Sequence, residues 1–243
     1  MDTLALYRLS PALIPLITSF LILIVEAFIK NSKTISFFLA LASVVAGFIL
    51  CTVLFPLKGV FLFGNSLFLG QIWIILSAVL LLTAALIICF SYKDIHLNGE
   101  YYFFVLMAVF GMMGVAASFN LLMIFLFIEL LSLCFYIMVT YNSRDVRANE
   151  GALKYFILGA FAAGFFVLGI AFVYATTGSL LISNLGSFLG AQTTIPITLY
   201  IGISCLLVAL GFKVAAVPFH MWTPDAYEAA PVQVTSFMAT GVK

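Results

Sequence analysis

Long apolar runs alternate with short polar joints along the whole 243-residue chain. A helix needs about 20 mostly apolar residues to cross the hydrocarbon core of a bilayer. The pattern therefore predicts about eight spans, the last incomplete: Pro11–Ile29, Ser36–Phe55, Ile72–Phe90, Tyr102–Phe119, Leu121–Thr140, Ala152–Thr176, Pro196–Phe219 and Val232 onward. Asn120 alone separates the fourth and fifth spans, so we expect a tight turn there. Between Gly178 and Thr194 we expect an interfacial loop or a short surface helix.

Composition supports this reading, since 65% of the residues are hydrophobic and only 8% are charged. A soluble domain carries about 25% charged residues. The predicted fold class is therefore all-α, a polytopic transmembrane helix bundle that forms one membrane domain over residues 1–243. A net charge of +1 without a basic tract argues against a nucleic-acid partner. The four cysteines stand singly in different apolar runs, so no zinc or Fe–S site is predicted.

The charges of the polar joints predict an orientation, because Lys and Arg accumulate in cytoplasmic loops. With alternating spans, one side of the membrane receives Lys30, Lys33, Lys93, Arg144 and Arg147, and the other receives Arg8 and Lys58. This asymmetry predicts an N-terminus on the non-cytoplasmic side. The last apolar run stops at Lys243 after too few residues to cross a bilayer, so we expect the sequence to be the N-terminal part of a longer protein.

Four charged residues lie within or against the apolar runs: Glu129, Lys154, Lys213 and Lys243. An ionised side chain at the centre of a membrane costs about 2.5–3.5 kcal/mol, so such residues usually mark an ion or proton path. Consecutive antiparallel helices tend to pack together, which favours a pair between Glu129 and Lys154. Burial lowers the pKa of a lysine and a nearby carboxylate raises it. A Glu–Lys pair that opens and closes can therefore make the lysine bind and release a proton in turn. A protonated, hydrogen-bonded Glu129 and a snorkelling Lys154 are the structural alternatives.

The seventh run predicts a broken helix, because Pro218 removes a backbone donor at membrane depth and Pro224 and Pro231 follow it. Irregular backbone at that depth is tolerated where it is buried in protein or lines a cavity, and transporters use such breaks at ion sites. The following joint also holds His220, Asp225 and Glu228. We therefore predict a structured re-entrant joint, with an ordinary surface loop as the alternative.

The motif GFKVAAVPFHMWTPDAYEAAP, residues 211–231, resembles the signature of the antiporter-like subunits of respiratory complex I. Together with GALKYFILGA at residues 151–160, it is most similar to the N subunits of bacterial NADH-quinone oxidoreductase. This resemblance covers the N-terminal half of such a subunit. It implies a fourteen-span all-helical protein with two inverted five-helix repeats, the first beginning around the fourth span.

The resemblance also implies roles for the charged residues. Glu129, Lys154, Lys213 and Lys243 match the family's proton-transferring acid and lysines, which follow a route along the membrane midplane. Gln233 stands where relatives usually carry a proline.

The function implied is that of a proton-translocating membrane subunit, driven by electron transfer from NADH to quinone in other subunits. NADH, FMN, the Fe–S clusters and the quinone are expected on those subunits, and no cofactor is expected in this chain. The implied partners are other membrane subunits of complex I, especially neighbouring antiporter-like subunits, in the lipid bilayer of a bacterial inner membrane. Two alternatives remain: a subunit of a multi-subunit cation/proton antiporter, and a scaffold whose buried charges only fix helix packing.

Overall fold

The structure is a computed structural model that describes residues 3–29, 32–94, 97–141, 146–192 and 194–242. Its helices are α1 (Thr3–Phe28), α2 (Lys33–Leu54), α3 (Gln71–Ser91), α4 (Glu100–Ala117), α5 (Leu121–Val139), α6 (Val146–Thr177), α7 (Ile182–Ala191), α8 (Ile197–Lys213), α9 (Trp222–Ala229) and α10 (Val232–Phe237). A π-helical turn, Met238–Val242, continues α10. The all-α membrane fold predicted from the sequence is confirmed.

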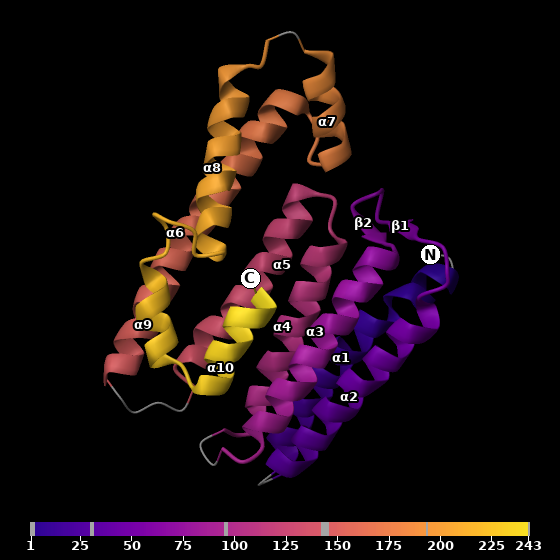
Figure 1. The fold of residues 1–243 in the computed structure, drawn as a ribbon, viewed down its shortest axis with the longest axis vertical. Coiled ribbons are helices and arrows are strands. Elements are labelled where there is room, and N and C mark those ends of the chain that lie inside the picture. Colours follow the sequence, from indigo (N-terminus) through magenta and orange to yellow (C-terminus); the bar gives the residue numbers. More distant parts are fainter. Residues whose placement is uncertain (1–2, 30–31, 95–96, 142–145, 193, 243) are drawn as a thin grey trace.

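Helices α1 to α5 lie side by side as one bundle, and α4 is the most buried of the helices long enough to span a membrane. Helices α6 and α8 form a pair to one side of α5 (Figure 1). Helix α9 packs against the beginning of α6, and α10 returns to contact α3 and α5. The chain between α8 and α10 therefore connects the outlying pair with the bundle.

Six helices in the described residues are long and apolar enough to cross a membrane: α1 to α6. The seventh and eighth predicted spans correspond to the shorter helix α8 and to α10 with its π-helical turn. The seventh run is shorter than its apolar length suggests, because α8 begins only after Pro196 and ends at Lys213, five residues before Pro218. The apolar residues beyond Lys213 lie in a turn.

Helices α6 and α8 approach each other closely at a pair of glycines. A Cβ atom added to Gly169 would lie 2.9 Å from the carbonyl oxygen of Gly202, and one added to Gly202 would lie 3.2 Å from that of Gly169. Small residues at a helix crossing let two backbones touch, which is a common way to pack helices in a bilayer. The glycines thus hold α8, and the lysine at its end, close to α6.

The tight turn expected around Asn120 is confirmed. Helix α4 ends at Ala117 and α5 begins at Leu121. The Asn120 side chain accepts a hydrogen bond of 2.9 Å from the Leu122 backbone N–H, which caps the free amino end of α5. The short helix expected after Gly178 is also present as α7, and none of its residues is buried.

A β-hairpin between α2 and α3 is the element that the sequence analysis missed. Strands β1 (Val60–Leu62) and β2 (Leu67–Leu69) pair antiparallel through a turn in which Gly64 and Asn65 have positive φ angles. Glycine and asparagine adopt this left-handed conformation most readily, so Gly64-Asn65 was an available hairpin signal. The Phe119 N–H donates to the Ser66 carbonyl, which ties the hairpin to the α4–α5 turn.

The position of Arg8 changes the count of loop charges from which the orientation was predicted. The sequence analysis assigned it to a polar joint, but it lies inside α1 and is fully buried. Its guanidinium donates a 2.9 Å hydrogen bond to the Leu69 carbonyl at the end of β2. Lys58 is exposed on that side of the molecule, so Arg8 holds the hairpin against α1 and does not add to the loop charge.

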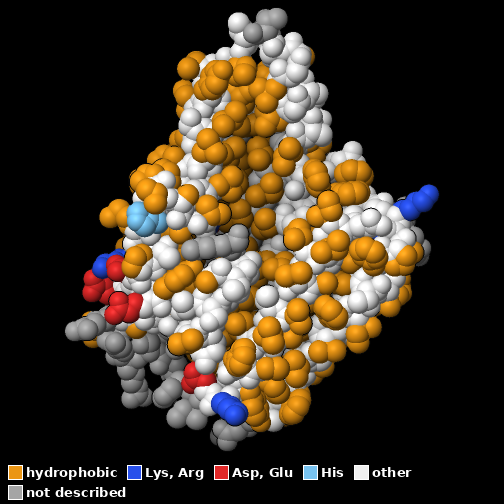
Figure 2. Space-filling view, in the orientation of Figure 1, with side chains coloured by type: hydrophobic (Ala, Val, Ile, Leu, Met, Phe, Trp, Pro, Cys, Tyr) orange, Lys and Arg blue, Asp and Glu red, His pale blue; other side chains and the backbone are white. Residues whose placement is uncertain are grey.

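The surface matches a protein surrounded by lipid. Figure 2 shows one face on which apolar side chains form a broad central area, while acidic and basic side chains stand at its margins. Most of the visible charges lie near α9 and at the lower end of the molecule. An apolar surface of this extent fits the hydrocarbon core of a membrane.

Candidate functional site

Lys213 is the last residue of α8, where the helix breaks. The N–H groups of Ala215 and Ala216 close the helix end by donating to the carbonyls of Phe212 and Gly211. Ala215 adopts a left-handed conformation, φ 55°, that usually falls to glycine at such a helix end. The amine of Lys213 therefore lies at the negative end of the helix dipole, which favours a cation there.

The indole ring of Trp222 makes a hydrogen bond across the helix break that follows Lys213. Trp222, the first residue of α9, donates from Nε1 to the Phe212 carbonyl over 2.9 Å. The Phe212 carbonyl, which already accepts from the Ala215 N–H, thereby gains a second donor from beyond the helix break. The peptide bond between Val217 and Pro218 in the intervening turn is cis. A turn and the helix α9 thus follow Lys213, and the re-entrant character of this joint stays a prediction.

Glu129 and Ser132 of α5 face the Lys213 amine. The Lys213 Nζ atom lies 3.6 Å from Glu129 Oε1 and donates a 2.7 Å hydrogen bond to Ser132 Oγ. Ser132 in turn donates to the Ile128 carbonyl over 2.6 Å. The Lys213 side chain is only 11% exposed and that of Glu129 24% exposed. We call Glu129, Ser132 and Lys213 the inner site.

The expected pairing of Glu129 with Lys154 is wrong in this structure. Lys154 Nζ lies 2.9 Å from Glu150 Oε1 on its own helix and 2.9 Å from Asp225 Oδ2 on α9. Successive helical residues point about 100° apart, and the next residue, Tyr155, is the one that packs against Tyr136 of α5. Lys154 is therefore turned away from α5 towards α9. Lys154, Glu150 and Asp225, each about half exposed, form what we call the outer cluster.

The remaining predicted residues are not gathered at either group. His220 and Glu228 are exposed, on the turn before α9 and on α9 itself. Pro224 lies in the first turn of α9, where its missing N–H leaves no helical hydrogen bond unmade. Lys243 lies outside the described residues, one position beyond the π-helical turn.

A cavity of about 430 Å³ opens beside Lys213. Its walls come from α3, α4, α5, the end of α8 and the π-helical turn, and they are mostly apolar. Lys213 and Thr240 contribute its polar side chains. Lys213 thus borders a mostly apolar space between the bundle and the π-helical turn.

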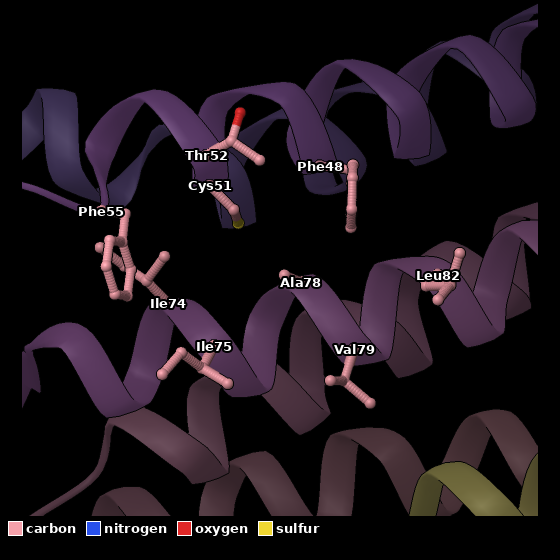
Figure 3. Close-up of a pocket in the computed structure, with 9 residues that line it drawn as sticks. All are labelled: Phe48, Cys51, Thr52, Phe55, Ile74, Ile75, Ala78, Val79 and Leu82. Carbon is pink, nitrogen blue, oxygen red and sulfur yellow. The ribbon is translucent and has the colours of Figure 1, made fainter.

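A second pocket, between α2 and α3, lacks such chemistry (Figure 3). Its volume is about 380 Å³, and its lining has no acidic or basic side chain. The Thr52 hydroxyl donates to the Ile49 carbonyl of its own helix. Within the described part of the chain, no group of three or more His, Cys, Asp or Glu side chains is placed to hold a metal ion.

Sequence reasoning missed two polar residues near Lys213. Ser132 and Tyr136 follow Glu129 at three and seven positions, a spacing that places all three on one face of α5. This polar stripe within an apolar span was a readable signal. Glu26, a half-buried acid in α1, was also missed; it accepts a 2.6 Å hydrogen bond from Ser36 Oγ.

Comparison with known proteins agrees with this architecture. The sequence model of the family described as NADH:quinone oxidoreductase/Mrp antiporter, transmembrane, matches residues 118–243, which contain both the inner site and the outer cluster. The chain belongs to this family. The resemblance seen in the motif of residues 211–231 is thereby confirmed.

Relatives in this family include subunit N 1 of NADH-quinone oxidoreductase from Chloroherpeton thalassium, 40% identical over 93% of this chain and 48% of that protein. A chain of respiratory complex I from Thermus thermophilus superimposes with a TM-score of 0.82 at 30% identity, over 96% of this chain and 50% of that one. A chain of the Mrp complex from a Dietzia species shares the fold, with a TM-score of 0.82 at 19% identity, over 100% and 46% of the two chains. The chain spans about half the length of the proteins it matches.

Proposed function

We propose that this chain is part of a proton-translocating membrane subunit of an NADH-quinone oxidoreductase, and that Glu129 and Lys213 exchange the transported proton. The observation that carries the proposal is the ion pair of the inner site: an acid and a lysine, both mostly buried, at the break of a membrane helix. Ionisable pairs at that depth are rare and usually functional.

The contact geometry suits a switch. An ion pair of 3.6 Å is looser than a direct charged hydrogen bond, and the amine is anchored at the same time by Ser132. Small movements of α8 against α5 would therefore change the Glu129–Lys213 distance. Because the pair lies in a low-dielectric setting, such changes strongly alter the preference of the lysine for its proton.

The onward path is assigned to the cavity beside Lys213. Its lining includes Lys213 of the inner site and Thr240 of the π-helical turn, after which Lys243 follows in the sequence. We propose that Lys243 receives the proton from Lys213. We propose that other subunits of a bacterial inner-membrane complex hold the electron-transfer cofactors, which are NADH, FMN, Fe–S clusters and quinone. The proposed partners of this chain are neighbouring antiporter-like subunits. Its N-terminus is proposed to lie outside the cytoplasm.

The replacement Lys213→Met, made in the full-length protein in its own membranes, tests the proposal. Methionine keeps the length and the apolar stem of the side chain but cannot carry a proton. We expect the initial rate of NADH-driven proton uptake by inverted vesicles to fall by about tenfold or more, since a positioned proton donor contributes at least that much.

Lys58→Met is the matched control, because Lys58 is exposed before β1. The amount of assembled complex is measured for each variant by NADH oxidation with an artificial electron acceptor. Proton uptake at the wild-type rate by assembled Lys213→Met complexes would show that the inner site does not carry the proton.

The alternative function, a cation/proton antiporter subunit, is favoured by the shared fold with the Mrp complex chain. Purification of the full-length protein separates the two proposals. Flavin and Fe–S subunits that co-purify with it support the oxidoreductase. Their absence, together with rescue of sodium-sensitive growth by the protein, supports the antiporter.

A further inference from the structure

Tyr136 carries a hydroxyl beside the inner site that the contacts described so far leave unexplained. The residue is 9% exposed, and its hydroxyl lies beside Ser132 without making a hydrogen bond of normal distance and angle within the described structure. Nearly all buried polar atoms are hydrogen-bonded, so an exception needs a physical reason.

The Tyr136 ring lies beside the Lys213 amine. Tyr136 lies one helical turn beyond Ser132 on α5, and helical side chains lean towards the amino end of their helix, here towards Ser132 and Glu129. The Lys213 Nζ atom is 5.9 Å from the centre of the Tyr136 ring. From the other side, a methyl group at Gly159 of α6 would collide with the Tyr136 hydroxyl oxygen. The glycine thus leaves room for this hydroxyl between α5 and α6.

Proton transfer from Lys213 creates a need for a hydrogen-bond donor. An ammonium group has three donors and no acceptor, whereas a neutral amine exposes a lone pair that must accept a hydrogen bond when it is buried. The Ser132 hydroxyl already donates to the Ile128 carbonyl. A protonated Glu129 could donate, but that contact returns the proton to the lysine.

We propose that Tyr136 is a positioning residue of the inner site, whose hydroxyl donates a hydrogen bond to the Lys213 amine once that amine has lost its proton. In the exchange with Glu129 an N–H bond of Lys213 breaks and an O–H bond forms on the acid, and in the onward transfer the new N–H bond forms on the next lysine. In both transfers Tyr136 keeps its own proton. Before the transfer, the face of the same ring favours the ammonium form through a cation–π contact. This inference rests on the proposed function of Glu129 and Lys213.

Tyr136→Phe in the full-length protein tests the inference, because it keeps the ring and removes only the hydroxyl. The ring contacts with Tyr155 and Phe156 should persist. We expect normal assembly and a fall of about tenfold in the proton uptake rate, less than the roughly hundredfold or larger effect of a group that transfers the proton itself. We also expect a larger solvent deuterium isotope effect than in the wild type, because proton release from Lys213 becomes the slow step.

Tyr101→Phe is the matched control. Tyr101 is fully buried in the first turn of α4, and its hydroxyl also lacks a hydrogen-bond partner. The same chemical change there should leave proton uptake and the isotope effect at wild-type values. A fall in both tyrosine variants would indicate a general packing effect and overturn the assignment of Tyr136.

The remaining outcomes separate this inference from the proposed function. Wild-type uptake in Tyr136→Phe, with uptake lost in Lys213→Met, overturns the role of Tyr136 alone. Wild-type uptake in Lys213→Met overturns the proposed function as well. If Tyr136→Phe fails to assemble, the inference is also contradicted, because removal of an unpartnered hydroxyl should not prevent folding.

Discussion

The inner site and the outer cluster are both lysine–carboxylate groups, and they flank the same helix break. In the outer cluster the two N–O distances are 2.9 Å, and in the inner site the distance is 3.6 Å. Exposure runs in the opposite direction: 49% for the Lys154 side chain against 11% for that of Lys213. The shorter contacts are thus the more exposed ones.

The difference shows that distance alone does not rank these ion pairs. Exposed pairs contribute little because solvent and flexible side chains offset the attraction. A buried pair is sensitive to the loss of either member, since the remaining charge stays in a low-dielectric environment. The interaction energy of the inner site therefore depends strongly on the charge of each of its members. The outer cluster, by contrast, connects α6 with α9.

Gly151→Ala should disturb the outer cluster and lower the stability of the protein more than the replacement of another glycine of α6. A Cβ atom there would lie 2.6 Å from the Asp225 carbonyl oxygen and 2.8 Å from the Ala229 Cβ atom, so α9 would have to move. We expect the full-length protein to lose about 1–3 kcal/mol of stability, as is usual for overpacked contacts. The measurement is thermal unfolding in detergent.

Gly164→Ala provides the comparison on the same helix. An added methyl group meets no other atom within 4 Å at Gly164, so we expect unchanged or slightly higher stability, because alanine is the better helix former. Equal effects of the two replacements would contradict the close contact between α6 and α9.

Lys154→Met should have only a small effect on proton uptake. The lysine is half exposed, so we expect normal assembly and proton uptake within about twofold of the wild-type rate, in line with the small contribution of exposed pairs. The measurement is NADH-driven uptake by inverted vesicles. A loss as large as that expected for Lys213→Met would mean that Lys154 is a proton-transfer station, as the sequence alone predicted, and would remove the contrast between the two groups.

The fold could be predicted from the sequence to the extent that local pattern determines it. Apolar run length located α1 to α6, Asn120 located the turn before α5, and the prolines located the break after Lys213. These features depend on the residues of one segment. The hairpin of residues 60–69 was missed because its strands are short and sit within apolar sequence.

Partner choice could not be predicted, because it depends on how helices are rotated about their axes. Proximity in sequence favoured Lys154 as the partner of Glu129. The structure instead turns Tyr155 towards α5 and brings Lys213, 84 positions from Glu129 in the sequence, to the acid. Ser132 was overlooked for a related reason, since a serine in an apolar span gains meaning only when an amine arrives from another helix.

The most direct test of the account is the double replacement Glu129→Gln with Lys213→Met, compared with each single replacement. Removing one charge leaves the other unpaired in the bundle, whereas removing both leaves none, so assembly should be best in the double variant. The account predicts that this well-assembled double variant still fails to take up protons when NADH is oxidised. Uptake at the wild-type rate in the double variant would contradict it, and would show that the two charges serve only the packing of α5 against α8.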